Sequence, residues 1–172
     1  GRLGSTVVDL GNKFAATESE IVNMGLRLAG AGQTIGLTEA QILGMGTALS
    51  SLGIEAEMGG SAFSRVMVDI SAAVNKGGDD LRKFAEVAGM TGDQFAAKFK
   101  TDAAGAVIAF IEGLGRIQKT GGDVFGTLDN LGLAEIRVRD ALLRAAGAGD
   151  LFREAMEVGS NAWQENTALT RE

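Results

Sequence analysis

The feature that most constrains this chain is a helical spacing of apolar residues, which continues along almost its whole length. The clearest example is the set Val107, Phe110, Ile111 and Leu114, which recur every three or four residues and share one face of an α-helix. No segment combines strict alternation of apolar and polar residues with β-branched enrichment. The pattern therefore predicts an all-α fold with no sheet. We expect Val107, Phe110, Ile111 and Leu114 to be core residues that face Phe63, Met67 or Ile70 of a neighbouring helix.

Glycine supplies the breaks between the expected helices. Proline is absent, and 26 of the 172 residues are glycine, about twice the ordinary share. Gly53, Gly77, Gly89 and Gly121 each follow a periodic segment, where a helix often ends in a left-handed residue that glycine adopts cheaply. We therefore expect a multi-helix bundle of about eight or nine short-to-medium helices.

Three helix starts carry the capping-box pattern, in which a Thr hydroxyl accepts a backbone N–H three residues on and a Glu or Gln bonds back. They begin at Thr17, Thr38 and Thr91, with Glu20, Gln41 and Gln94 as the returning residues. With the glycine stops, these starts place the helices. The expected ranges are 17–31, 38–52, 61–76, 79–88, 91–100, 102–120, 122–131, 134–147 and 150–169.

A glycine-rich stretch at residues 37–53, "LTEAQILGMGTALSSLG", raises the question of a phosphate-binding loop. Gly44-Met45-Gly46 is not followed by a third glycine in register, and no Lys-Ser or Lys-Thr pair follows it. We expect these glycines to lie inside a helix. Each costs roughly 0.5–1 kcal/mol relative to alanine, and close approach of neighbouring helices is the expected compensation.

Side chains suited to catalysis near neutral pH are scarce. The chain has no His, Cys or Tyr, so acid–base chemistry would depend on carboxylates. Asp79 and Asp80 precede a helix and are interpreted as N-caps, while Glu154 and Glu157 are expected on a solvated helix face. We expect no enzyme, no cofactor, and no catalytic, cofactor-binding or metal-binding residue.

The formal net charge of −6 opposes an electrostatic grip on nucleic acid, and no specific nucleic-acid binding is expected. Arg137, Arg139 and Arg144 gather around Asp140. Arg137 and Arg144 are expected to share a face, with Arg139 and Asp140 pointing elsewhere. Surface solubility is the favoured interpretation, and an anionic partner is the alternative.

The only tryptophan, Trp163, fits an apolar packing stripe of the last helix better than a ligand platform. Phe152 and Met156 belong to the same stripe, and Leu169 extends it. We expect this helix to be long.

The longest uncharged run, Ala40–Ile54, has 15 residues, fewer than the roughly 20 needed to span a bilayer. Membrane contact is therefore not supported. The start of the chain shows no signal-peptide pattern, and we expect the chain to be a piece of a longer protein.

Much of the chain resembles a known family. The stretch "ATESEIVNMGLRLAGAGQTIGLTEAQILGMGTALSSLGIEAEMGGSAFSRVMVDISAAV" is similar to the conserved core region of tail tape measure proteins of long-tailed bacteriophages and prophages. The segments "LRKFAEVAGMTGDQFAAKFKTDAAGAVIAFIEGLG" and "LGLAEIRVRDALLRAA…ENTAL" resemble its continuation. The resemblance runs from about residue 9 onward. It rests on an ordered series: Glu18 and Ile21, Gly36-Leu37-Thr38, Gly53-Ile54, Gly59-Gly60-Ser61, Phe84-Ala85 and Phe99.

The resemblance implies a structural component of a phage tail. Tape measure proteins are long and mostly helical, fill the lumen of the tail tube, set tail length during assembly and leave the tube ahead of the DNA. The expected partners are tail tube and tail assembly proteins, together with self-association through small-residue helices. The expected locations are the tail tube lumen of the virion and, during assembly, the bacterial cytoplasm.

The resemblance brings no catalytic residue to this chain. We expect residues 1–172 to form a single α-helical domain within a longer tape measure chain. The alternative is a non-enzymatic α-helical module that binds a protein or acts on a membrane.

Overall fold

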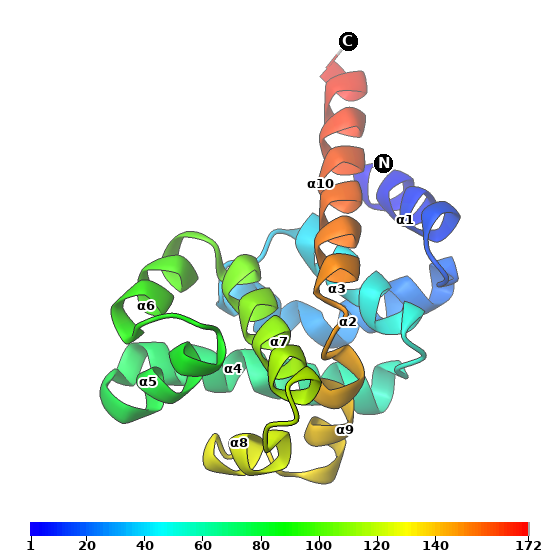
Figure 1. The fold of residues 1–172 in the computed structure, drawn as a ribbon. Helices are drawn as coiled ribbons and strands as arrows, with labels where there is room; N and C mark the ends of the chain where they lie inside the picture. The colour runs from blue at the N-terminus through cyan, green and yellow to red at the C-terminus, as the bar shows by residue number, and fades with distance from the viewer. Residues whose placement is uncertain (172) are drawn as a thin grey trace. The chain divides into compact units, whose positions relative to one another are not determined.

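The structure, a computed structural model, describes the backbone of residues 1–171 and the side chains of residues 1–166. Within that range the chain forms ten α-helices and one short π-helix, with no strand, which confirms the all-α fold (Figure 1). The elements are α1 (Arg2–Lys13), α2 (Glu18–Thr34), α3 (Glu39–Ser51), η1 (Ala56–Gly60), α4 (Ser61–Lys76), α5 (Gly78–Val87), α6 (Gly92–Thr101), α7 (Ala103–Lys119), α8 (Val124–Asn130), α9 (Ile136–Ala145) and α10 (Gly149–Arg171).

The helices group into two units. Unit 1 comprises Gly1–Ser61 and the chain from Asp150 onward, so it contains α1, α2, α3, η1 and α10. Unit 2 comprises Ala62–Gly149 and contains α4 to α9. The expectation of a single domain stays a prediction, because such a grouping does not say whether the units fold independently.

Each of the nine predicted helices is present, and each end lies within three residues of its predicted place. Two elements were missed, α1 and η1. Helix α1 carries Leu3, Val7 and Leu10 at helical spacing, but no side chain caps its start and no glycine ends it. The predicted contribution of Leu169 to α10 lies outside the described side chains.

The predicted helix starts and stops are confirmed. In all three capping boxes both hydrogen bonds form; around Thr38, its Oγ1 accepts from the Gln41 N–H at 3.0 Å and Gln41 Oε1 accepts from the Thr38 N–H at 3.0 Å. The four glycines predicted to end helices have positive φ values between 74° and 77°. They are Gly53, Gly77, Gly89 and Gly121.

Three further side-chain caps were not predicted; one is Glu135, whose carboxylate accepts hydrogen bonds from the Arg137 and Val138 N–H groups at the start of α9. Asp102 and Asp123 each accept a hydrogen bond at 2.9 Å from the backbone N–H three residues on, which begins α7 and α8. The donors are Gly105 and Gly126. A Cβ at either glycine would come within 3 Å of the carboxyl carbon of the capping aspartate. Glycine at the third position after the aspartate therefore leaves room for the carboxylate to accept the hydrogen bond.

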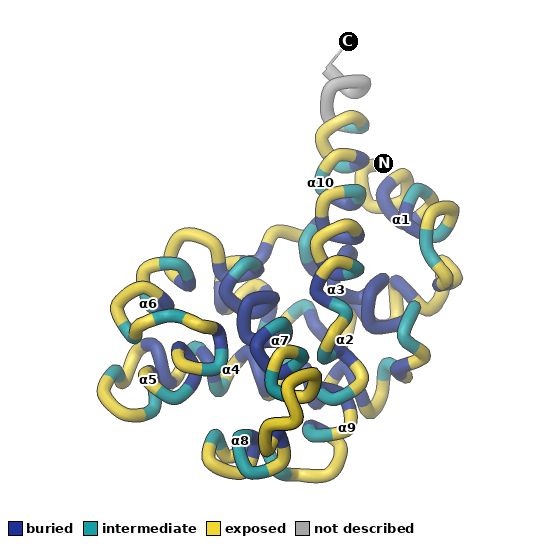
Figure 2. The backbone as a smooth tube through the Cα atoms, viewed as in Figure 1, coloured by how far each residue is buried: buried dark blue, intermediate teal, exposed yellow. Residues whose placement is uncertain are grey.

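Helix α3 is the central helix of unit 1. Every residue from Ile42 to Ser50 is buried, so the helix is enclosed on all sides (Figure 2). The uncharged run at residues 40–54 is thus accounted for by burial within unit 1.

The two glycines of α3 lie where neighbouring backbones cross it. A Cβ on Gly44 would meet the Met156 Cα of α10 at 2.7 Å, and a Cβ on Gly46 would meet the Gly25 N of α2 at 3.3 Å. Close helix approach is confirmed as the role of both glycines.

Helix α7 has the corresponding place in unit 2. Its predicted core residues Val107, Phe110, Ile111 and Leu114 are fully buried. The Phe110 ring lies 5.3 Å from the Phe84 ring of α5, tilted by 53°. The residues of α4 predicted to face Phe110 are also fully buried, but a direct contact with them stays a prediction. They are Phe63, Met67 and Ile70.

Candidate functional site

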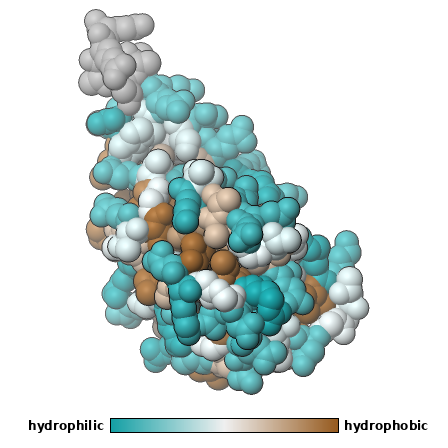
Figure 3. All heavy atoms as spheres, turned by 90° about the vertical axis from the view of Figure 1, so that its left-hand side faces the viewer, coloured by the Kyte–Doolittle hydropathy of each residue, from teal (hydrophilic) through white to brown (hydrophobic). Residues whose placement is uncertain are grey.

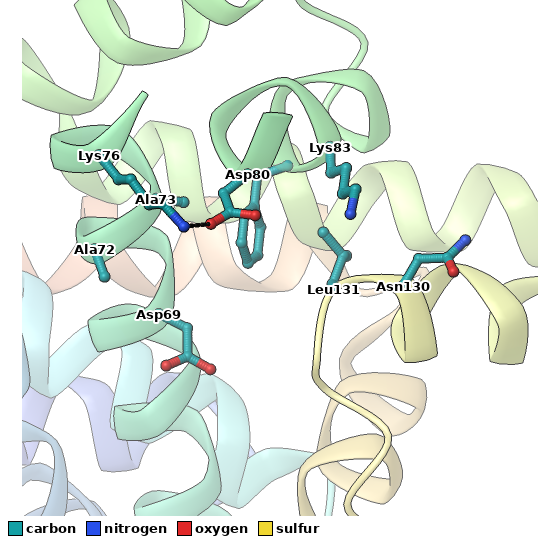
Figure 4. Close-up of a pocket in the computed structure, with 9 residues that line it drawn as sticks. Asp69, Ala72, Ala73, Lys76, Asp80, Lys83, Asn130 and Leu131 are labelled. Carbon is teal, nitrogen blue, oxygen red and sulfur yellow. Dashed lines mark hydrogen bonds and ion pairs between the residues drawn. The ribbon is translucent and has the colours of Figure 1, made fainter. Parts of the chain in front are cut away.

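The strongest candidate for a site is a charged cleft in unit 2, where α4, α5 and the end of α8 come together (Figure 4). It consists of two adjoining hollows of about 210 and 360 Å³. Both hollows are lined by Lys83, Asn130 and Leu131. The first adds three charged residues, Asp69, Lys76 and Asp80.

Glycine positions the charged pair in this cleft. Lys76 ends α4, and the next two residues, Gly77 and Gly78, have φ values of +74° and +62°. Only glycine adopts such angles routinely. The sharp turn starts α5 at once and brings the Asp80 carboxylate within 2.9 Å of the Lys76 ammonium.

The electrostatics of the pair favour two charged partners. The hydrogen bond and charge of Lys76 hold the pKa of Asp80 below its ordinary value, and Asp80 in turn raises the pKa of Lys76. The Lys76 side chain is largely solvent-exposed, and the Asp80 side chain is about half-exposed. A general acid working near neutral pH needs a raised carboxyl pKa, so Asp80 is unsuited to that role.

Asp69 also forms an ion pair at the surface, whereas Lys83 lies beside uncharged residues. Asp69 lies 3.7 Å from the Arg65 guanidinium, one helical turn away on α4. Lys83 extends from α5 toward the end of α8, beside Leu131 and Asn130 (Figure 4). Among the described residues, no group of three or more Asp or Glu side chains could hold a metal ion.

Charge stays at the surface throughout the described part of the chain. The buried polar side chains found there are Thr6, Thr47 and Ser50, none of which ionises. On the face drawn in Figure 3, hydrophilic side chains surround a smaller hydrophobic group. The large desolvation that shifts pKa values at many active sites is therefore missing from the described residues.

The interpretation of Asp79 and Asp80 as N-caps is wrong. The N-cap of α5 is Gly77, and no side chain caps this helix. Because the helix begins one residue earlier than predicted, both carboxylates lie in its first turn, where the helix dipole favours negative charge. Asp79 pairs with Arg82 at 3.4 Å.

Glu154 and Glu157 are exposed on α10, which confirms the predicted solvated face.

The arginine cluster of α9 differs from its prediction in one respect. Asp140 does not point away from Arg144 but pairs with it at 3.2 Å, because residues four apart on a helix are neighbours. Arg139 lies 5.2 Å from the ring of Phe125, a half-exposed residue that sequence reasoning did not single out.

Trp163 packs as predicted. It is partly buried against the cluster that α1, α2 and α3 form around Leu10 and Ile21. The Arg2 guanidinium lies 5.1 Å from its ring, within the range of a cation–π contact. The partner was missed because α1 itself was not predicted.

Comparison with models of protein families, with curated proteins and with solved structures finds no match to this chain. None of the helices in the described residues combines the length and apolarity needed to cross a membrane.

Proposed function

We propose that this chain is a non-enzymatic structural segment of a tail tape measure protein. In this role it occupies the tail tube lumen of a long-tailed phage or prophage and contributes to tail length during assembly. Its proposed partners are tail tube and tail assembly proteins.

The proposal is supported by the positions that the residues on which the resemblance rests occupy in the fold. Gly36 and Gly53 have positive φ values of 94° and 77° at helix ends, and Thr38 caps α3. Ile21 and Phe84 are buried. The residues on which the resemblance rests thus specify turns, caps and core contacts of this chain, so the resemblance does not rest on surface composition.

The pair Gly59-Gly60 gives the same support. Both glycines are buried in η1, which packs against α2. A Cβ on Gly60 would come 2.7 Å from the Arg27 Cβ and 3.1 Å from the Met24 Sδ. The sequence at this point is therefore set by the packing of η1 on α2.

The chemistry of the charged cleft supports a role without catalysis. Its exposed Lys76–Asp80 pair keeps both groups charged, and the chain has no His, Cys or Tyr to add a neutral-pH base or nucleophile. We therefore propose occupancy and assembly as the function of the segment.

Because the two units are folded, the segment would add less to the tail length than an extended helix of the same number of residues. A single continuous helix of 172 residues would span about 260 Å at 1.5 Å per residue. A chain folded into two units of short helices contributes far less. We propose that this segment stays folded, and that length is set by helical regions elsewhere in the polypeptide.

The experiment uses the phage or prophage that carries the gene. Tails are purified and searched for peptides of residues 1–172 by mass spectrometry, and tail length is measured by electron microscopy for wild type and for an in-frame deletion of unit 2. We expect the peptides in the tails and a shortening well below the value for an extended helix. A deletion of equal length in a region without glycine breaks is the control.

Two results would contradict the proposal. If the peptides are missing from tails of normal length, the segment is not a tail component. If deletion of unit 2 shortens the tail by the full 1.5 Å per residue, the segment is extended in the tail and the folded form is not the one that functions there.

A further inference from the structure

Helix α2 carries two apolar stripes, and only one of them is used within unit 1. The inner stripe includes Ile21, Met24 and Leu28, which are fully buried. The outer stripe consists of Val22, Leu26 and Ala29, spaced four and then three residues apart. Leu26 is the most exposed large hydrophobic residue described, at 71%. The outer stripe has the spacing of a seam that packs against another helix.

The outer stripe lies in a groove. Two hollows of about 160 and 530 Å³, both lined by Leu3 and Val22, run along α2 between α1 and the start of α3. We call this the outer groove. Leu3, from α1, is 54% exposed, and the small, partly buried Ala29 also lines the groove. Side chains spaced by one helical turn would fit such a surface.

The charges at the outer groove have one sign. Glu18 lines one hollow and Glu39 lines the other, and no Lys or Arg lines either. Both carboxylates are exposed, and among the described residues neither takes part in an ion pair. An occupant that carries Lys or Arg beside its apolar side chains would therefore be complementary to the groove.

We propose that the outer groove binds an amphipathic α-helix of a partner protein. The helix has apolar residues at positions i, i+4 and i+7 and basic residues on the flanks that face Glu18 and Glu39. A second copy of this chain is disfavoured at the same place, because it would bring its own Glu18 and Glu39 to the interface. An anionic membrane is disfavoured by the same charges. The inference does not depend on the proposed tail function.

The test uses the 172-residue chain and three labelled synthetic peptides that are monomeric at the working concentration. The first has leucines at i, i+4 and i+7 with flanking lysines; the second has glutamates in place of the lysines; the third keeps the lysines but has glutamines in place of the leucines. Binding is measured by fluorescence anisotropy at low and high salt. We expect only the first peptide to bind, and more weakly at high salt.

Substitutions locate the binding surface. Leu26→Asp is expected to weaken binding by about tenfold or more, since it places an unpaired charge in the apolar seam. The matched control is Val68→Asp on α4, which is half-exposed in unit 2 and should leave binding unchanged. A double change of Glu18→Gln and Glu39→Gln should remove most of the salt dependence. Because these side chains are exposed, circular dichroism should show the fold intact in each variant.

Several outcomes would overturn the proposal. Binding of the lysine-flanked peptide that is unaffected by Leu26→Asp, or equally reduced by Val68→Asp, would place the contact elsewhere. Equal binding of the glutamate-flanked peptide would refute the charge argument. A dimer in sedimentation equilibrium that is lost in Leu26→Asp would make a second copy the occupant. Binding to vesicles containing phosphatidylglycerol that is lost in the same variant would make a membrane the occupant.

Discussion

Both units are built around one enclosed helix, α3 in unit 1 and α7 in unit 2, yet their surfaces differ. In each central helix, glycine lies where a neighbouring backbone crosses: Gly44 meets α10, and a Cβ on Gly115 would lie 2.7 Å from the Gly147 N. The same packing device thus serves both cores. The difference lies outside the cores.

The surface of unit 2 carries ion pairs within its helices, whereas unit 1 exposes an apolar groove. Arg82 alone pairs with both Asp79 and Glu86, one turn to either side on α5. In unit 1, the apolar side chains of Leu3 and Leu26 are exposed beside Glu18 and Glu39. Surface pairs of this kind contribute little stability but keep a face soluble. Unit 2 also exposes Phe125 and Ile136, but the proposed contact surface lies in unit 1, where the exposed apolar side chains line a groove.

The largest expected effect tests whether the two units unfold together. Phe110→Ala removes a fully buried ring from unit 2 and should cost roughly 3–5 kcal/mol of unfolding free energy. Trp163, the only tryptophan, lies in unit 1. Thermal unfolding followed by both Trp fluorescence and far-ultraviolet circular dichroism therefore separates the units.

If the units unfold independently, Phe110→Ala shifts the circular dichroism midpoint and leaves the fluorescence midpoint in place. If they unfold as one, both midpoints fall together, which would support the single-domain prediction. Phe125→Ala, at a half-exposed position in the same unit, is the control with little expected effect. An unchanged melting temperature by both probes would show that Phe110 is not a core residue.

The next effect concerns the crossing at the centre of unit 1. Gly44→Ala places a Cβ against the backbone of α10 at Met156 and should destabilise by about 1–3 kcal/mol, the usual cost of overpacking. Gly30→Ala is the matched control in α2, because a Cβ there meets nothing within 4 Å. It should stabilise by about 0.5–1 kcal/mol through helix propensity.

Urea denaturation measures both changes. Equal effects from Gly44→Ala and Gly30→Ala would mean that Gly44 does not lie at a close crossing. Gly113→Ala extends the comparison to unit 2, where a Cβ would lie 2.6 Å from the Val87 carbonyl carbon.

Helix positions were predictable because their signals are local. A capping box such as Thr91 to Gln94 and a stop such as Gly121 each act within a few residues. Helix α1 has apolar residues at helical spacing but was missed because it has neither a side-chain N-cap nor a glycine stop; it packs on α2 and α3. The π-helix η1 has no periodic signal over its five residues.

The candidate sites were less predictable, because they depend on what packing leaves exposed. The Lys76–Asp80 pair spans a helix break at Gly77-Gly78, so its i,i+4 spacing did not suggest a shared face. The outer stripe at Leu26 has the same period as the buried stripe of α2. Only the fold shows which of the two is covered.

A smaller effect is expected from a buried hydroxyl in unit 1. Thr6 is fully buried in α1, and its Oγ1 has no hydrogen-bond partner among the described groups. Thr6→Val removes the unsatisfied hydroxyl and should stabilise unit 1 by about 1 kcal/mol. Thr47→Val is the matched control, because the Thr47 hydroxyl donates to the Leu43 carbonyl at 2.8 Å.

The Thr47 variant should not gain the same stability in urea denaturation. A loss of stability in Thr6→Val would mean that its hydroxyl is bonded in solution.

The smallest effect is expected at the exposed Lys76–Asp80 pair of unit 2. The pKa of Asp80 is lowered from 3.8, so its contribution to stability is present above that value and is lost as the pH falls through the lowered pKa. The pKa of Lys76 is raised from 10.5, so its contribution is present below that value and is lost as the pH rises through the raised pKa. The melting temperatures of wild type and Lys76→Gln should therefore differ by a small and constant amount from about pH 5 to pH 9, and should converge in strong acid.

A difference that persists below the pKa of Asp80 would show that Lys76 acts through its aliphatic stem rather than through its charge. An effect as large as that of Gly44→Ala would contradict the contrast between the units, since the surface of unit 2 would then contribute to stability as much as the crossing inside unit 1.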